Sequence, residues 1–437
     1  MSAVVLMDLS PYSPADEAED AWLDKLSRRL ESRDHVLHVD GVTSRDDEDE
    51  AALRRGPDGR WWAGRYIGEL RFEDREIRIV PRLGIDVVGA WLGHALNLDV
   101  VPQTATARGG QPLVVQLVDR IWSAAVADAA RHGGPRLRAA RRHDGLSLRG
   151  RLDVHQTGRH RAARRPLLTS RLAERDLANP VARSLVLADR TLRSLLPDRP
   201  TWRPTRCDEV LAQLRGAVGA RPDLPDVTEL ARVRYSPLTR RYEAVATWSH
   251  EIARGKGRLT SAAGDDTAGV LLDVAELWEL FLLHCARHLF GSTHVVHGTT
   301  TKSDGHLLVS RDHPAARLGR IKPDLLILGP DGRPEIVIDA KYKRLRSWLG
   351  SPSGVDRGDL YQLAAYLFGH PHASGMLAYP EHATDEAIAD TRGPWIAASG
   401  QRVTFARVPV HRDAATEWLS QLVAPAEPDR ARPMTPG

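Results

Sequence analysis

The chain has 437 residues, of which 42% are hydrophobic, and its 61 Lys plus Arg nearly balance 57 Asp plus Glu, leaving a formal net charge of +4. This length is enough for two or three domains with a substantial core. No apolar run reaches the 18 residues that a membrane helix needs, and the first ten residues lack the basic start and cleavage site of a signal peptide, so we expect a cytoplasmic protein without membrane contact. The two cysteines, Cys207 and Cys285, lie far apart in the sequence, which argues against a disulfide framework or a zinc site.

The N-terminal residues 1–84 predict a mixed α+β domain. Apolar residues alternate or recur at helical spacing in four segments, which predict a strand at 4–9, a helix at 17–30, and strands at 65–72 and 76–80. The acidic run at residues 46–50 is expected to be a solvated loop.

Residues 85–255 predict a mainly helical middle region with a basic surface. Apolar spacing predicts helices at 86–96, 113–131, 181–196 and 240–254, with Trp91 and Trp122 on buried faces. Between Arg131 and Arg171 there are twelve Arg and only two acids, a local excess of ten positive charges. Such an excess favours contact with the phosphates of DNA, and an acidic surface on a partner protein would fit it as well.

Composition also predicts where the C-terminal domain begins and ends. The Gly, Ser, Thr and Asp residues of 255–266 predict a linker before a domain at residues 266–423. Residues 424–437 contain four prolines and no apolar periodicity, and they predict a disordered tail.

The C-terminal domain is predicted to open with a long helix at residues 270–290. Glu276 and Glu279 lie one turn apart on one side of this helix. Either glutamate can supply a carboxylate to a site, or both can simply solvate the exposed edge of a core helix.

Two apolar strands, each with one acid, are joined by a turn within residues 322–341. The dipeptide Asp331-Gly332 favours a two-residue type I′ hairpin loop, because both central positions of that loop need positive φ. That loop sets a register in which Asp324 lies directly opposite Asp339. Like charges opposite each other destabilise a sheet unless something offsets them. Mg²⁺, which takes one or two carboxylates and keeps several waters, would do so; the alternative is an ordinary hairpin with solvated acids.

Lys341 follows Asp339 by two residues, so the alternation of a strand points both side chains to one face. Only six of the 61 basic residues are Lys, and three of these fall within residues 322–343. A compact ammonium can orient a water or a phosphate oxygen in a way that a planar guanidinium does not. The sequence therefore predicts an active site at Asp324, Asp339 and Lys341.

A helix at residues 359–368 presents Asp359, Gln362 and Tyr366 on one face. Asp359 can instead cap the helix N-terminus while Tyr366 is half buried. A short buried strand is predicted at residues 375–380.

These motifs together resemble the PD-(D/E)xK nuclease superfamily. Asp324 after a proline, the run Asp339-Ala-Lys341 and the spacing Gln362-x-x-x-Tyr366 look like its three landmarks, the last in the form seen in RecB-like members. More narrowly, the segments from Asp339 through the predicted strand at 375–380 resemble McrC, the nuclease subunit family of McrBC-type restriction systems. Segments of the N-terminal half agree more loosely.

The resemblance implies an α/β fold, with a PD-(D/E)xK restriction-endonuclease-like C-terminal domain and a mixed, mainly helical N-terminal half. It implies a Mg²⁺-dependent endonuclease that cuts double-stranded DNA in a restriction system for phage defence, with Mn²⁺ able to substitute. It also implies a hexameric AAA+ GTPase or ATPase of the McrB type as partner. The residues expected to act are Asp324, Asp339 and Glu279 as metal ligands, Lys341 beside them, and Gln362 and Tyr366 as supports or DNA contacts.

Two other functions fit the same sequence. The chain lacks a G-x-x-x-x-G-K-[ST] loop, so any motor must be another protein. One alternative is a non-cleaving adaptor that activates an AAA+ motor. The other is a self-sufficient, RecB-like repair nuclease that acts on DNA ends.

Overall fold

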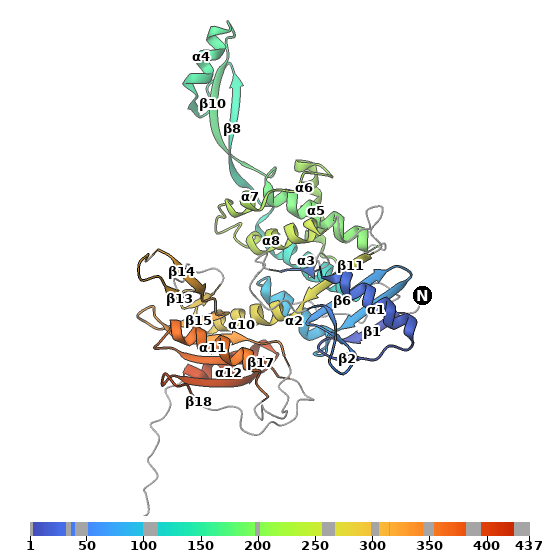
Figure 1. The fold of residues 1–437 in the computed structure, drawn as a ribbon. Helices are drawn as coiled ribbons and strands as arrows, with labels where there is room; N and C mark the ends of the chain where they lie inside the picture. The colour runs from blue at the N-terminus through green and yellow to red at the C-terminus, as the bar shows by residue number, and fades with distance from the viewer. Residues whose placement is uncertain are drawn as a thin grey trace, which may run out of the picture.

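The computed structural model describes residues 3–31, 36–39, 51–98, 112–196, 202–255, 267–298, 306–313, 315–343, 354–381 and 395–423. The predicted acidic loop at 46–50, most of the predicted linker at 255–266 and the predicted tail at 424–437 lie outside these residues. Within them the chain is a mixed α/β protein built from several sheets (Figure 1). A search of the same residues finds no helix with the length and apolar character to cross a membrane.

The N-terminal part is a five-stranded sheet with the order β1-β7-β6-β11-β3. Asp16 caps the N-terminus of helix α1, which buries Trp22 against this sheet. The predicted strands and helix of residues 1–84 are confirmed with small shifts of their ends. The elements are β1 (Ala3–Met7), β3 (Val36–Leu37), α1 (Glu17–Leu30), β6 (Tyr66–Phe72), β7 (Arg75–Val80) and β11 (Thr267–Asp273), with a small second sheet of β2 (Pro11–Tyr12), β4 (Leu53–Arg55) and β5 (Trp61–Ala63).

Strand β11 departs from the predicted domain organisation. Residues 267–273 were expected to belong to the C-terminal domain, but they pair antiparallel with β6 and parallel with β3 in the N-terminal sheet. The pairing depends on close approach of the two backbones at Gly68 and Gly269, where φ is +148° and +140°. A Cβ at Gly68 would lie 2.0 Å from the Val270 carbonyl oxygen, so only glycine fits there.

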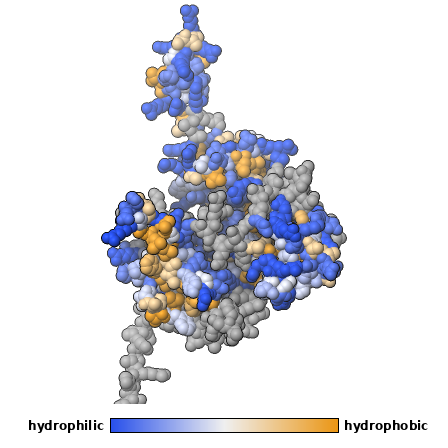
Figure 2. All heavy atoms as spheres, viewed as in Figure 1, coloured by the Kyte–Doolittle hydropathy of each residue, from blue (hydrophilic) through white to orange (hydrophobic). Residues whose placement is uncertain are grey.

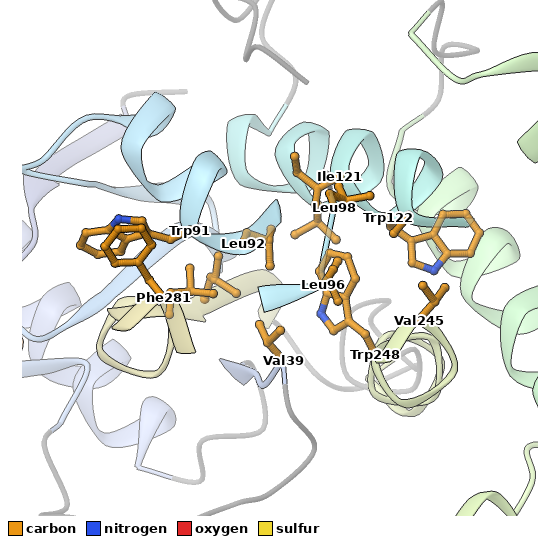
Figure 3. Packing of buried hydrophobic residues seen from close by; sticks show 14 of the residues in the cluster. Val39, Trp91, Leu92, Leu96, Leu98, Ile121, Trp122, Val245, Trp248 and Phe281 are labelled. Atoms are coloured by element: carbon orange, nitrogen blue, oxygen red, sulfur yellow. The ribbon is translucent and has the colours of Figure 1, made fainter. Parts of the chain in front are cut away.

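The middle region is helical, as predicted, and its core is continuous with that of the C-terminal domain. Trp91 and Trp122 are both fully buried; the Trp91 ring stacks 5.4 Å from Phe281, and the Trp122 Nε1–H donates to Ser249 Oγ at 2.9 Å. Figure 3 shows Trp91, Phe281 and Trp122 along one apolar layer between the helices. The helices are α2 (Ile85–Ala95), α3 (Leu113–Ala129), α5 (Pro180–Leu195), α6 (Thr205–Val218), α7 (Val227–Ala231) and α8 (Tyr242–Arg254).

The basic stretch from Arg131 to Arg171 lies mostly in a projecting arm of residues 137–176, in which more residues belong to strands than to helix. Strands β8 (Leu137–Gly145) and β10 (Leu168–Asp176) make a long antiparallel ribbon, which carries β9 (Arg151–Leu152) and helix α4 (Val154–Ala162) at its far end. Figure 1 shows this arm standing away from the body, and Figure 2 shows a largely hydrophilic surface on it. Leu146 and Val154, which are 77% and 74% exposed, lie near its tip.

The C-terminal part is a six-stranded sheet with the order β12-β15-β16-β17-β19-β18. Along β16, Ile338 packs into the core that includes α10, whereas Val337 packs on the opposite face with residues of α11. Asp273 caps α10, so this helix starts at Val274 rather than at residue 270. The elements are α10 (Val274–Phe290), β12 (Val295–His297), β13 (His306–Val309), β14 (Arg317–Arg320), β15 (Leu325–Leu328), β16 (Pro334–Ala340), α11 (Arg357–Gly369), β17 (Ser374–Pro380), β18 (Trp395–Ile396), β19 (Arg402–Val408) and α12 (Arg412–Val423).

Candidate active site

The hairpin of β15 and β16 brings the two predicted acids together. Leu325 is registered with Ile338, so that Asp324, the residue before β15, lies across from Asp339 at the end of β16. Asp324 Oδ2 also accepts a hydrogen bond from the Ala340 backbone N–H at 2.6 Å. The predicted register at the acids is therefore confirmed.

The loop of this hairpin differs from the prediction. The Gly329 N–H donates to the Arg333 carbonyl at 2.8 Å, which leaves a three-residue loop in which Gly332 has a φ of +77° while Asp331 does not have a positive φ. The two-residue type I′ loop is therefore wrong. The strand register shifts by one residue between Ile327 and Leu328, and this bulge offsets the extra loop residue.

Asp339 is a buried carboxylate with unmet hydrogen-bonding capacity. It is 1% exposed, and within the part of the chain that the structure describes neither of its Oδ atoms accepts a hydrogen bond of regular geometry, although Lys341 and Asp324 lie close enough to lower its pKa. The Lys341 Nζ lies 3.1 Å from Asp339 Oδ2 and supplies the nearest positive charge. Burial raises the pKa of Asp339 above the usual range, and the Lys341 ammonium opposes that rise.

Lys341 is held by a chain of hydrogen bonds from α11. Its Nζ donates to Gln362 Oε1 at 2.6 Å, and the Gln362 Nε2 donates to the Tyr366 hydroxyl at 2.8 Å. Burial disfavours the charged form of Lys341, but the nearby carboxylates of Asp339, Asp324 and Asp359 outweigh it and raise the pKa of the ammonium. The structure thus gathers Lys341, Gln362 and Tyr366 around Asp339, with Tyr366 buried rather than half buried.

A second ion pair lies beside the first. Asp359 is 1% exposed, accepts from Lys343 Nζ at 2.8 Å and from the Tyr379 hydroxyl at 3.3 Å, and lies 4.0 Å from Lys341 Nζ. Burial and the charge of Asp359 raise the pKa of Tyr379, which keeps its hydroxyl a donor. Asp359 is not the helix cap, because Asp356 takes that role. The sequence interpretation gave no role to Lys343, although the alternation 339, 341, 343 places it on the same face.

The two glutamates of α10 have separate partners. Glu276 accepts from the Val39 backbone N–H at 2.6 Å and contacts the His38 ring, which ties α10 to the N-terminal part. Glu279 contacts the ring of His297, which is paired with Leu325 at the start of β15. No group of three or more His, Cys, Asp or Glu side chains in the described ranges is already arranged to hold a metal ion.

The acids nevertheless suit a hard divalent cation. The two Asp339 oxygens are buried without hydrogen bonds, and the carboxylate of Asp324 comes from the facing strand. Mg²⁺ typically uses one or two protein carboxylates, with waters and substrate phosphates filling its other positions. Asp324 and Asp339 therefore fit Mg²⁺ without a third protein ligand.

Comparison with known proteins matched a family model and five chains of solved structures, of which two are described here. A family model described as "McrBC 5-methylcytosine restriction system component" matches residues 62–380. A chain of the refined half-complex from a tetradecameric assembly of Thermococcus gammatolerans McrB AAA+ hexamers with bound McrC is 14% identical, with a TM-score of 0.52, and the match covers 97% of this chain and 100% of that one. A chain of the Thermococcus gammatolerans McrBC complex is 16% identical, with a TM-score of 0.38 and 65% and 86% coverage. No curated protein matches.

Proposed function

Because the chain belongs to the family of McrBC 5-methylcytosine restriction system components, we propose that it is the metal-dependent DNA endonuclease subunit of such a system. The observation that carries the proposal is the buried Asp339, whose oxygens lack hydrogen bonds, with Asp324 across the hairpin and Lys341 3.1 Å away. In this proposal the C-terminal sheet and its helices form a PD-(D/E)xK nuclease domain.

Each residue of the site then has a defined task. Asp324 and Asp339 would hold Mg²⁺, or Mn²⁺ in its place, and the bound ion would polarise the scissile phosphate and lower the pKa of a water. Lys341, protonated at neutral pH, would orient the attacking water or stabilise negative charge that develops on the phosphate. Gln362 and Tyr366 fix the position of the Lys341 ammonium through their hydrogen bonds. Glu279 is proposed as a further acid next to the site, oriented by His297.

We also propose that this subunit acts with a hexameric AAA+ GTPase or ATPase. The similar structure contains McrB AAA+ hexamers with bound McrC, and the likeness extends over nearly the whole of both chains. The basic arm of residues 137–176 projects from the body and exposes Leu146 and Val154 near its tip. A solvated ribbon that carries both positive charge and exposed apolar side chains suits contact with a protein partner or with DNA.

The alternatives predict different behaviour. A non-cleaving adaptor would have no need for a buried Asp339 next to a lysine held by two further residues, because an unmet buried carboxylate costs stability. A self-sufficient repair nuclease would cut linear DNA without a partner and would prefer ends to closed circles.

The proposal is tested by incubating circular and linear DNA with the protein in Mg²⁺, with and without an AAA+ nucleotide hydrolase of the McrB type. We expect cleavage by the wild type with the partner present, and none by Asp339→Ala or after chelation of the metal. Cleavage by Asp339→Ala at the wild-type rate would show that the proposed site is wrong. Stimulated nucleotide hydrolysis without any cleavage by the wild type would favour the adaptor.

A further inference from the structure

The N-terminal domain contacts the segment that carries both lysines of the site, on the face opposite to the lysine side chains. Tyr342 lies between Lys341 and Lys343, and the alternation of an extended chain turns it to the opposite face. Its side chain is 4% exposed and packs in the core that includes α10, where the Trp91 ring meets it edge-on at 6.3 Å. Tyr342 therefore belongs to the back of the site rather than to the substrate side.

Asp8 and Arg82, which follow strands of the N-terminal sheet, both contact Tyr342. The Tyr342 hydroxyl donates to Asp8 Oδ2 at 2.6 Å, and the guanidinium of Arg82 lies over the Tyr342 ring, 4.7 Å from its centre. Arg82 also donates from its Nη2 to the Lys343 carbonyl at 3.5 Å. Asp8 and Arg82 thus hold the side chain of Tyr342 and, through Arg82, the backbone of Lys343.

Asp8 and Arg82 form one unit because they follow neighbouring strands. Asp8 comes directly after β1 and donates its N–H to the Val80 carbonyl at the end of β7 at 3.0 Å. Its Oδ1 accepts from the Arg82 N–H at 2.6 Å. Asp8 is fully buried and Arg82 is 7% exposed, so this polar network is shielded from water. Buried networks of this kind hold a single geometry, because a broken hydrogen bond leaves an unsatisfied group in a medium of low dielectric.

We propose that Tyr342 is a positioning residue: through Asp8 and Arg82 the N-terminal domain fixes the backbone that places Lys341 and Lys343 in the site, so that the rate of cleavage depends on how that domain is seated. This inference rests on the proposed nuclease function. Lys341 has one other backbone anchor nearby, the hydrogen bond from its N–H to the Ala378 carbonyl at 2.8 Å. Loss of the Tyr342 hydroxyl would let the segment shift without removing any group that touches DNA or metal.

The test compares Tyr342→Phe with Tyr242→Phe in the full chain. Tyr242 is a matched control, because it too is buried, at 0% exposed, and its hydroxyl donates to the Gly133 carbonyl at 2.9 Å in the helical middle region. Single-turnover DNA cleavage is measured with the AAA+ partner and Mg²⁺, together with the DNA concentration for half-maximal rate, the stimulation of nucleotide hydrolysis and the thermal midpoint.

We expect Tyr342→Phe to lower the single-turnover rate between about tenfold and about a hundredfold, the range for a misplaced catalytic group, with DNA affinity and hydrolase stimulation unchanged. Tyr242→Phe should lower the thermal midpoint by a similar amount and leave the rate intact. Asp8→Asn combined with Tyr342→Phe should cleave no more slowly than the slower single variant, because both substitutions act on the same hydrogen bond: Tyr342→Phe removes its donor and Asp8→Asn removes its charged acceptor.

Equal rates for Tyr342→Phe and Tyr242→Phe would overturn the inference, as would additive losses in the double variant. Asp339→Ala is run in parallel to separate the two proposals. If Asp339→Ala is inactive and Tyr342→Phe cleaves like the wild type, the nuclease function stands and the inference fails. If Asp339→Ala also cleaves like the wild type, both fail.

Discussion

Replacing Lys341 with Met should reveal how much its ammonium offsets the free-energy cost of the buried Asp339 carboxylate. Methionine keeps the apolar stem and removes the charge that lies 3.1 Å from Asp339 Oδ2. If Asp339 stays ionised, the loss of one partner of a buried pair costs about 3–5 kcal/mol. If it takes up a proton, the cost at pH 7 is limited to about 4 kcal/mol, because protonating a carboxyl with an ordinary pKa costs about 1.36 kcal/mol per pH unit. We therefore expect a loss of up to about 4 kcal/mol at pH 7, less the part of this cost that the burial of Asp339 already imposes on the wild type.

The pH dependence of this loss of stability tests whether Asp339 takes up a proton in the variant. At pH 5 the same protonation costs only about 1.5 kcal/mol, so the difference in unfolding free energy between wild type and Lys341→Met should shrink. Urea unfolding of metal-free protein at both pH values measures it. Lys25→Met is the control, because Lys25 pairs with Glu73 at 3.3 Å on the surface and its side chain is 59% exposed; its loss should stay below about 1 kcal/mol. A loss for Lys341→Met as small as this, or one equal at both pH values, would refute the reasoning.

Two further outcomes follow from the site and its supports. Gln362→Leu removes the acceptor of the Lys341 ammonium and should slow single-turnover cleavage at least about tenfold while the stimulation of the hydrolase is unchanged; an unaltered rate would show that Gln362 does not position the lysine. The hydrogen bond to Glu276 holds the pKa of His38 above its usual value. The stability that it gives is therefore full below about pH 6.5 and is lost as the pH rises through the higher folded value. The difference in thermal midpoint between wild type and His38→Asn should be largest near pH 6 and should shrink toward pH 9, and a difference that is the same at every pH would contradict this.

The sequence predicted the acids' pairing correctly for a partly wrong reason. Glycine at position 332 was required for the turn, but the loop has three residues rather than two, and the bulge next to Ile327 corrects the register. Local turn chemistry therefore does not determine pairing by itself. What determines it here is the fit to the two cores, because a slip of one residue would exchange the side chains that β15 and β16 supply to each core.

Features that leave no distinct pattern in neighbouring residues of the sequence could not be predicted. The two buried residues of β10, Thr169 and Ser170, are polar, so this strand of the ribbon has no apolar alternation to mark it in the sequence. The three apolar residues 270–272 run directly into the apolar pattern of α10, and only the capping Asp273 marks where the strand stops and the helix starts. The hydrogen bond between Tyr342 and Asp8 joins residues 334 positions apart, and no rule of sequence spacing covers such a separation.

The position of β11 limits how this chain can be divided. Within the described residues, β11 lies between β6 and β3, and it runs directly into the cap of α10. A fragment that starts at Val274 would contain the C-terminal part without this strand, and a fragment that ends at Gly255 would leave β6 with an open edge. An uncovered apolar strand edge invites pairing with other chains. Two such fragments produced together, with β11 kept on the second, should associate by completing the sheet, so the chain can be split before β11 into two parts whose association restores the complete sheet.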